Sequence, residues 1–116
     1  MHELSLCHSI HGIAERAREG RPVETIHLQV GQLRQVVPET LIYCWSLVTA
    51  GTGLDGSRLE IDHIPIRLHC NDCRAETLIT EALVLTCGEC SGGAITVLTG
   101  EEFMLTSMDL KETAHG

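Results

Sequence analysis

The chain has 116 residues, 43% hydrophobic and 21% charged, which are ordinary globular fractions that exclude a mainly disordered protein. Acidic residues outnumber basic ones by 16 to 8, so the formal net charge is −8, which argues against a general nucleic-acid-binding or anionic-membrane-binding face. No secretory signal and no apolar stretch of roughly 18 residues is visible. We therefore expect a cytoplasmic protein with reduced thiols, built as one small domain or two very small ones.

Helical periodicity predicts a first helix over residues 4–18, which Gly20 terminates. Residues 23–30 alternate with period two and predict a half-buried strand that ends at Gly31. The residues expected on the inward face of the helix are Leu6, Ile10, Ile13 and Ala17, with Leu4, Cys7 and Ala14 beside them.

A second helix is predicted from Pro38 to about Ala50, because proline followed by glutamate suits the first turn of a helix. A further strand covers residues 58–66. If the two strands share a sheet, the helix between them forms a right-handed parallel crossover. The residues expected to face inward on this helix are Leu41, Ile42, Trp45 and Val48.

The pattern changes between residues 66 and 98, where two short Cys pairs are separated by a loop or hairpin, and a last strand follows over about residues 102–111. The predicted fold class is therefore α+β, a small mixed sheet with two helices plus an inserted zinc-ribbon domain. We expect residues 1–65 and 100–112 to form the α+β domain, and residues 66–99 to form the ribbon before the last strand.

The two Cys pairs indicate a metal site. Cys70 and Cys73 are separated from Cys87 and Cys90 by 13 residues, a spacing that lets two tight turns aim four sulfurs at one point. Four thiolates fill a tetrahedron and leave no position for water, so we expect structural Zn²⁺. Two disulfides, a rubredoxin-like iron site and redox-active dithiols are the alternatives. Three basic residues nearby in the sequence offset the charge of such a centre: Arg67, His69 and Arg74.

The N-terminus offers a second candidate site. The α-amine of Met1, the amide nitrogen of His2 and its ring Nδ1 can chelate one metal ion, and the amide of Glu3 can supply a fourth nitrogen. Such a nitrogen set suits Ni²⁺ or Cu²⁺, and the Glu3 carboxylate can add an oxygen or orient a ligand. From spacing alone, an N-terminal histidine without any metal-binding role is the simpler interpretation.

The remaining histidines and cysteines carry weaker signals. His8 and His11 are three residues apart on the first helix and form either a secondary metal site or plain surface histidines. Cys7 and Cys44 lie on or near apolar helix faces, where we expect them to be small buried hydrophobic residues and not nucleophiles.

The order of several short segments resembles the HypA/HybF family of hydrogenase nickel-incorporation proteins over nearly the whole chain. These segments are Met1-His2-Glu3-Leu4-Ser5, Val30-Gly31-Gln32-Leu33, Val37-Pro38-Glu39-Thr40-Leu41, Gly51-Thr52, Leu59-Glu60-Ile61, Pro65, the two Cys pairs, Gly100-Glu101-Glu102-Phe103 and Ser107-Met108. Two positions differ from the pattern of many members, which have glycine in place of Arg74 and proline in place of Gly88.

The resemblance implies a metallochaperone and not an enzyme. It implies that His2 is the main Ni²⁺ ligand, with the Met1 amine and Glu3 in support, and that the four cysteines hold structural Zn²⁺. The implied partners are the GTPase HypB and the large subunit of [NiFe] hydrogenase, and some members also serve urease maturation. Nucleic acid and membranes are not implied partners, whereas an exposed sheet edge leaves room for a homodimer.

Rival interpretations differ in what they require. A zinc-ribbon interaction or nucleic-acid-binding module without nickel transfer is the main alternative, although a nucleic-acid ligand conflicts with the charge of −8. A rubredoxin-like electron carrier would hold iron in place of zinc. An enzyme is disfavoured, because closed four-cysteine coordination and the absence of a recognisable nucleophile–base pair leave no catalytic group.

Overall fold

A computed structural model describes residues 2–80 and 84–112, and at residue 2 it describes the backbone alone. The described chain forms two compact units, the first from residues 2–28, 36–62 and 105–112, and the second from residues 29–35 and 63–104 apart from the gap at 81–83. The elements are, in chain order, α1 (His2–Ala17), β1 (Val23–Gly31), the 3₁₀ turn η1 (Gln32–Arg34), α2 (Pro38–Thr49), β2 (Arg58–Ile64), β3 (Ile66–Cys70), β4 (Glu76–Ile79), β5 (Ile95–Thr99) and β6 (Phe103–Leu110).

Helix α1 buries a narrower stripe than its periodicity predicts. Cys7, Ile10 and Ala14 are buried, whereas Ile13 is 46% exposed and Ala17 is also exposed. The prediction that Ile13 and Ala17 face inward is therefore wrong. The physical reason is that α1 contacts the rest of the unit only through the face that carries residues 7, 10 and 14. Residue 13 lies about 100° around the helix axis from residue 14 and therefore points away from this face.

Helix α2 begins at Pro38 and buries Leu41, Trp45 and Thr49. Within this buried face the Trp45 indole N–H donates to Ser57 Oγ at 3.0 Å, which satisfies the polar end of the ring. Ile42 is 48% exposed, so its predicted inward position is wrong, because the buried stripe follows every fourth residue and excludes it.

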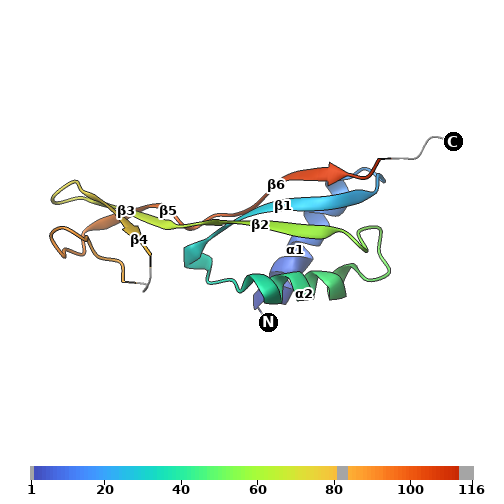
Figure 1. Cartoon of the computed structure of the whole chain (residues 1–116), viewed down its shortest axis with the longest axis horizontal. Coiled ribbons are helices and arrows are strands. Elements are labelled where there is room, and N and C mark those ends of the chain that lie inside the picture. The colour runs from blue at the N-terminus through green and yellow to red at the C-terminus, as the bar shows by residue number, and fades with distance from the viewer. Residues whose placement is uncertain (1, 81–83, 113–116) are drawn as a thin grey trace. The chain divides into compact units, whose positions relative to one another are not determined.

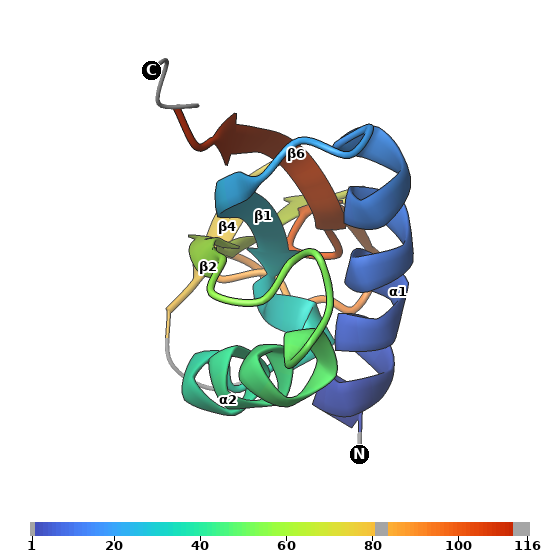
Figure 2. The ribbon, with the colours of Figure 1, turned by 90° about the vertical axis from the view of Figure 1, so that its right-hand side faces the viewer.

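The sheet of the first unit has strand order β2-β1-β6. Figure 1 shows β1 and β2 running in the same direction, so the intervening α2 forms a crossover between parallel strands, as predicted. Strand β6 runs in the opposite direction, and the Lys111 N–H donates to the Pro22 carbonyl at 3.0 Å, where β1 begins and β6 ends. Both helices lie on one side of this sheet (Figures 1 and 2). The sheet is therefore mixed, which confirms the α+β prediction.

The second unit is a three-stranded antiparallel ribbon of order β4-β3-β5. Its core consists of Ile66, Leu68 and Ile79, with four partly buried apolar side chains packed against them. The strand predicted over residues 58–66 is interrupted at Pro65, and its last predicted residue begins β3. Proline lacks the N–H that a continuous ladder needs, which is why the strand divides there.

Two glycines allow chain segments of the second unit to cross closely. The Gly31 N–H donates to the Glu102 carbonyl at 2.6 Å, and the Leu33 N–H donates to the Gly100 carbonyl at 2.8 Å. A Cβ atom on Gly31 would overlap the backbone of Gly100. Position 31 therefore requires glycine because there is no space for a Cβ atom, and not because its φ angle is unusual.

In the described part of the chain, neither helix has the length and apolar character needed to cross a lipid bilayer.

Candidate metal centre

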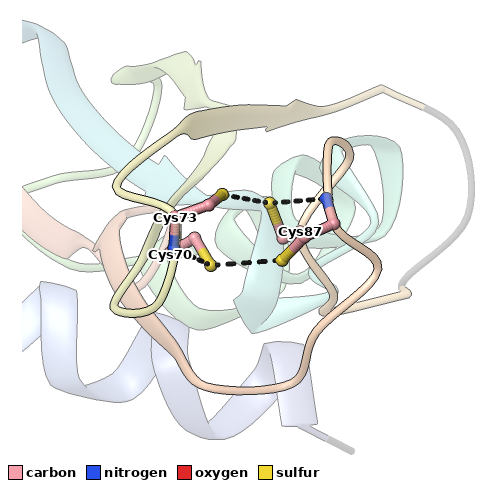
Figure 3. Close-up of side chains that lie close together, drawn as sticks. Cys70, Cys73 and Cys87 are labelled. Carbon is pink, nitrogen blue, oxygen red and sulfur yellow. Dashed lines mark hydrogen bonds between the residues drawn. The ribbon is translucent and has the colours of Figure 1, made fainter.

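The structure brings the four predicted cysteines together at one end of the antiparallel ribbon. Their sulfur atoms all lie within 4.8 Å of one another. Cys70 Sγ is 3.6 Å from Cys90 Sγ, and Cys73 Sγ is 3.5 Å from Cys87 Sγ, so the two pairs face each other (Figure 3). Tetrahedral zinc with Zn–S bonds of about 2.3 Å would separate the sulfurs by about 3.8 Å. The cluster therefore fits a zinc site, and the separations are too long for disulfide bonds.

Two equivalent turns position the sulfurs. In the first, the Arg74 N–H donates to the Cys70 carbonyl at 2.9 Å, and in the second the Ser91 N–H donates to the Cys87 carbonyl at 2.9 Å. Arg74 has φ 64° and Ser91 has φ 59°, so both turns close through a residue in the left-handed region. Arg74 and Ser91 therefore close the turns at the cost of the backbone strain that an L-residue has in this region.

Backbone amides point at the first sulfur of each pair. The Cys73 N–H lies 3.4 Å from Cys70 Sγ, while Cys87 Sγ receives the N–H groups of Cys90 at 3.5 Å and Glu89 at 3.3 Å. These N–H groups favour the thiolate, so they lower the pKa of the Cys70 thiol and lower that of Cys87 to about 6. Both sulfurs are thus prepared to act as anionic ligands.

The second sulfur of each pair has the opposite tendency. The Ala75 N–H favours the Cys73 thiolate, but the neighbouring sulfurs of Cys87 and Cys70 raise the pKa of Cys73 to about 12. The pKa of Cys90 is raised in the same way, although a backbone N–H favours its thiolate too. Four thiolates this close repel one another, and a soft divalent cation at their centre would remove that repulsion and release the remaining protons.

Two side-chain contacts of β4 lie near the cysteine cluster, and the first differs from expectation. Arg67, expected to offset the charge of the thiolates, forms an ion pair with Glu76 on β4. The Gly88 N–H donates to Thr77 Oγ1 at 2.9 Å, a bond that a proline at position 88 could not make. This bond ties the second turn to β4.

The predicted N-terminal site is only partly described. Met1 and the side chain of His2 lie outside the described residues, whereas the backbone of His2 begins α1. The Glu3 carboxylate lies at the beginning of α2, where its Oε2 accepts a hydrogen bond from the Val37 N–H at 3.2 Å. Sequence reasoning placed Glu3 beside the metal and missed this second contact, which depends on how the two helices pack.

The other predicted histidines do not gather into a site. His11 Nε2 lies 3.3 Å from Thr52 Oγ1, and the His11 ring centroid lies 6.3 Å from that of Trp45. His8 is exposed. Within residues 2–80 and 84–112, with the side chain of His2 set aside, the four cysteines are the only cluster of three or more metal-ligating side chains. No partner for His27 was predicted from the sequence, and in the structure its Nε2 lies 2.8 Å from Asp109 Oδ2 on the neighbouring strand.

Cys7 is buried as predicted, whereas Cys44 is less buried than predicted. The Cys7 thiol is fully buried and donates to the Leu41 carbonyl of α2 at 3.3 Å, and Cys44 is half-buried. Burial, followed by the proximity of Cys44 and of Glu3, raises the pKa of Cys7 to about 12. The Cys7 thiol is therefore a packing group and a weak donor at neutral pH.

Comparison with known proteins places these features in one family. The family model described as "Hydrogenase/urease nickel incorporation, metallochaperone, hypA" matches residues 1–110. A hydrogenase maturation factor HypA from Roseiflexus sp. (strain RS-1) is 32% identical over 115 residues, which cover 97% of this chain and 94% of that protein. The hydrogenase maturation factor HypA from Geobacter sulfurreducens is 33% identical over 111 residues, covering 96% of this chain and all of the relative.

The fold agrees with solved structures. The solution structure of the Ni metallochaperone HypA from Helicobacter pylori superimposes with a TM-score of 0.66 and 18% identity, covering 95% of this chain and 97% of that one. A second solution structure, of a HypA protein, gives a TM-score of 0.68 at 17% identity and covers 96% and 97% of the two chains. Together with the family model and the curated relatives, these matches show that the chain belongs to the HypA family of hydrogenase and urease nickel-incorporation metallochaperones.

Proposed function

We propose that this protein is a nickel metallochaperone that delivers Ni²⁺ during the maturation of [NiFe] hydrogenase. The observation that carries the proposal is the match of the HypA family model to residues 1–110. The relatives over nearly the full length are hydrogenase maturation factors. The four-cysteine cluster is compatible with the structural zinc that accompanies nickel transfer in this proposal.

Zn²⁺ is the proposed resident metal, held by Cys70, Cys73, Cys87 and Cys90. When bound it supplies charge compensation for four thiolates and a fixed cross-link between the two turns. Because four sulfurs complete a tetrahedron, the zinc has no open position for a reacting group, and we assign it a structural role. The protein then acts as a carrier, and not as an enzyme.

Ni²⁺ is the proposed cargo, bound by the Met1 amine, by His2 through its amide nitrogen and imidazole, and by Glu3. Helix α1 begins at His2, and the first four N–H groups of a helix have no intrahelical acceptor. The amide nitrogens of His2 and Glu3 are therefore available to a metal ion without the loss of a helical hydrogen bond. The negative charge of a deprotonated amide is also favoured at the positive end of the helix dipole.

The division of labour along the chain remains a prediction. We assign nickel binding to residues 1–65 with 100–112, and zinc binding to residues 66–99. The proposed partners are the GTPase HypB and the hydrogenase large subunit in the cytoplasm, with urease maturation proteins as further recipients and a homodimer as the oligomeric form. The net charge of −8 supports a cationic cargo and basic partner surfaces.

The experiment is a nickel titration of zinc-loaded, untagged protein that begins at Met1, with metal analysis of the same sample. We expect one zinc and one added Ni²⁺ per chain, and we expect His2→Ala or residues placed before Met1 to abolish the nickel site while zinc is retained. His8→Ala, at an exposed histidine of the same helix, is the matched control and should change nothing. Nickel binding unaffected by His2→Ala and by the extension would remove Met1 and His2 from the site. Zinc without any specific nickel would reduce the protein to a zinc-ribbon interaction module.

A further inference from the structure

Glu3 lies on the side of α1 that packs against the first turns of α2. Glu3, Cys7, Ile10 and Ala14 are spaced 4, 3 and 4 residues apart, which places them in one stripe along the helix. The last three are buried, at 0%, 2% and 0% exposure. The Cys7 thiol reaches the Leu41 carbonyl of α2 at 3.3 Å, so the stripe that ends at Glu3 faces the beginning of α2.

The beginning of α2 lacks a cap of its own. Its N-cap residue, Val37, has φ −87° and ψ 113° and no side chain that can accept a hydrogen bond. In a capping box, a Glu or Gln at the third helical position accepts the N–H of the N-cap residue, but here that position holds Thr40. The Glu3 carboxylate takes this role from the other helix, because its Oε2 accepts the Val37 N–H at 3.2 Å. A carboxylate at this place also interacts favourably with the dipole of α2.

We propose that Glu3 is a positioning residue whose carboxylate caps α2 and thereby holds the first turn of α1, so that Glu3 serves nickel through its backbone and not through its side chain. This inference rests on the proposed function, because it takes residues 1–3 as the nickel site. Terminal turns of helices fray readily, and a metal that binds a frayed turn must first order it. The Glu3–Val37 bond anchors the third residue of the chain and reduces that cost before the metal arrives.

The charge and the hydrogen bond of Glu3 can be separated by two substitutions. In Glu3→Gln the side-chain amide oxygen still accepts the Val37 N–H, whereas Glu3→Ala removes the acceptor. We expect Glu3→Gln to bind Ni²⁺ within about twofold of the unmodified protein and with the same nickel absorption bands. We expect Glu3→Ala to bind about tenfold more weakly, equivalent to reordering roughly one residue of backbone.

The experiment uses the full zinc-loaded chain beginning at Met1, with NiSO₄ titrations, absorption spectra of the nickel complex and hydrogen exchange of the Val37 amide. The matched control is Asp55→Ala, because Asp55 Oδ2 accepts the Gly51 N–H at 3.0 Å at the other end of α2. We expect Asp55→Ala to lose a carboxylate–backbone bond of the same kind without any change in nickel affinity. In Glu3→Ala the Val37 amide should exchange at least tenfold faster, and in Glu3→Gln at nearly the unmodified rate.

Each other result overturns the inference. Equal losses in Glu3→Gln and Glu3→Ala, with shifted nickel bands, would make the carboxylate a ligand. Unchanged nickel affinity in Glu3→Ala would leave Glu3 with a role in stability alone. Failure of the proposed function has a different signature, namely that His2→Ala leaves nickel binding intact. In that case the Val37 exchange rates still report whether Glu3 caps α2, while its role toward nickel is refuted.

Discussion

Gly31→Ala tests the close crossing in the second unit. The added methyl group would overlap the Gly100 backbone, and no side-chain rotation can relieve that overlap because the obstacle is main chain. The two segments must separate, which weakens the Gly31 N–H bond to Glu102 at 2.6 Å and the Leu33 N–H bond to Gly100 at 2.8 Å. Each bond contributes about 1 kcal/mol, and a buried group left unpaired costs about 1–3 kcal/mol more. We expect the free energy of unfolding to fall by about 3 kcal/mol.

The assay is urea unfolding of the zinc-loaded protein followed by far-UV circular dichroism. A loss of about 3 kcal/mol is a large part of the stability of a small protein and is easily measured. Gly12→Ala is the control of opposite sign, because a Cβ atom at this helical position would have its nearest neighbour, Arg16 Nη1, at 3.7 Å. We expect that variant to gain up to about 1 kcal/mol from helix propensity. A change below about 0.5 kcal/mol in Gly31→Ala would refute the steric reasoning.

Two further predictions concern the four-cysteine cluster. Arg74→Gly should raise the free energy of unfolding of the zinc-loaded protein by about 0.5–1 kcal/mol, because glycine adopts a φ of 64° without steric strain. The greater entropy of glycine in the unfolded state cancels only part of this gain. Arg74→Ala keeps the strain and should show no such gain in the same urea unfolding. Zinc binding at pH 7 should release at least two protons, because the raised pKa values of Cys73 (about 12) and Cys90 keep these two thiols protonated. Cys87, with its pKa lowered to about 6, is largely thiolate at this pH and adds little, and the lowered pKa of Cys70 reduces its share. As the pH falls below 6, Cys87 also takes up a proton, so the release should increase and zinc affinity should decline more steeply. Calorimetry in buffers of different ionisation enthalpy measures the release, and a pH-independent release near zero would contradict the assignment.

Sequence reasoning recovered the elements because their signals are local. The alternation in residues 23–30 and the Pro38-Glu39 start of α2 each depend on a few neighbouring residues, and the Cys-x-x-Cys spacing gave the cluster in the same way. It was wrong about Ile13 and Ile42, because the width of a buried stripe is set by the partner surface and not by the helix itself.

Contacts between distant segments were not predictable from periodicity. The Glu3–Val37 and His27–Asp109 hydrogen bonds join residues that are 34 and 82 positions apart. Glu3 belongs to the N-terminal motif, so the sequence led us to assign it to the nickel site. Its hydrogen bond with Val37 depends on how α1 packs against α2, which the sequence does not show. The ion pair of Arg67 with Glu76 was missed for a related reason, since the register of β3 on β4 decides which charge it meets.

The two units differ in how far apart in the sequence their contacting residues lie. All four cysteines lie between residues 70 and 90, and β3 and β4 are immediate neighbours in the chain. The sheet of the first unit, by contrast, needs β6, whose Lys111 end meets Pro22. Contacts between residues close in sequence form faster than contacts between distant ones, because less loop-closure entropy is lost. We therefore expect a refolding chain to bring the four thiols together before the sheet that carries α1 is complete.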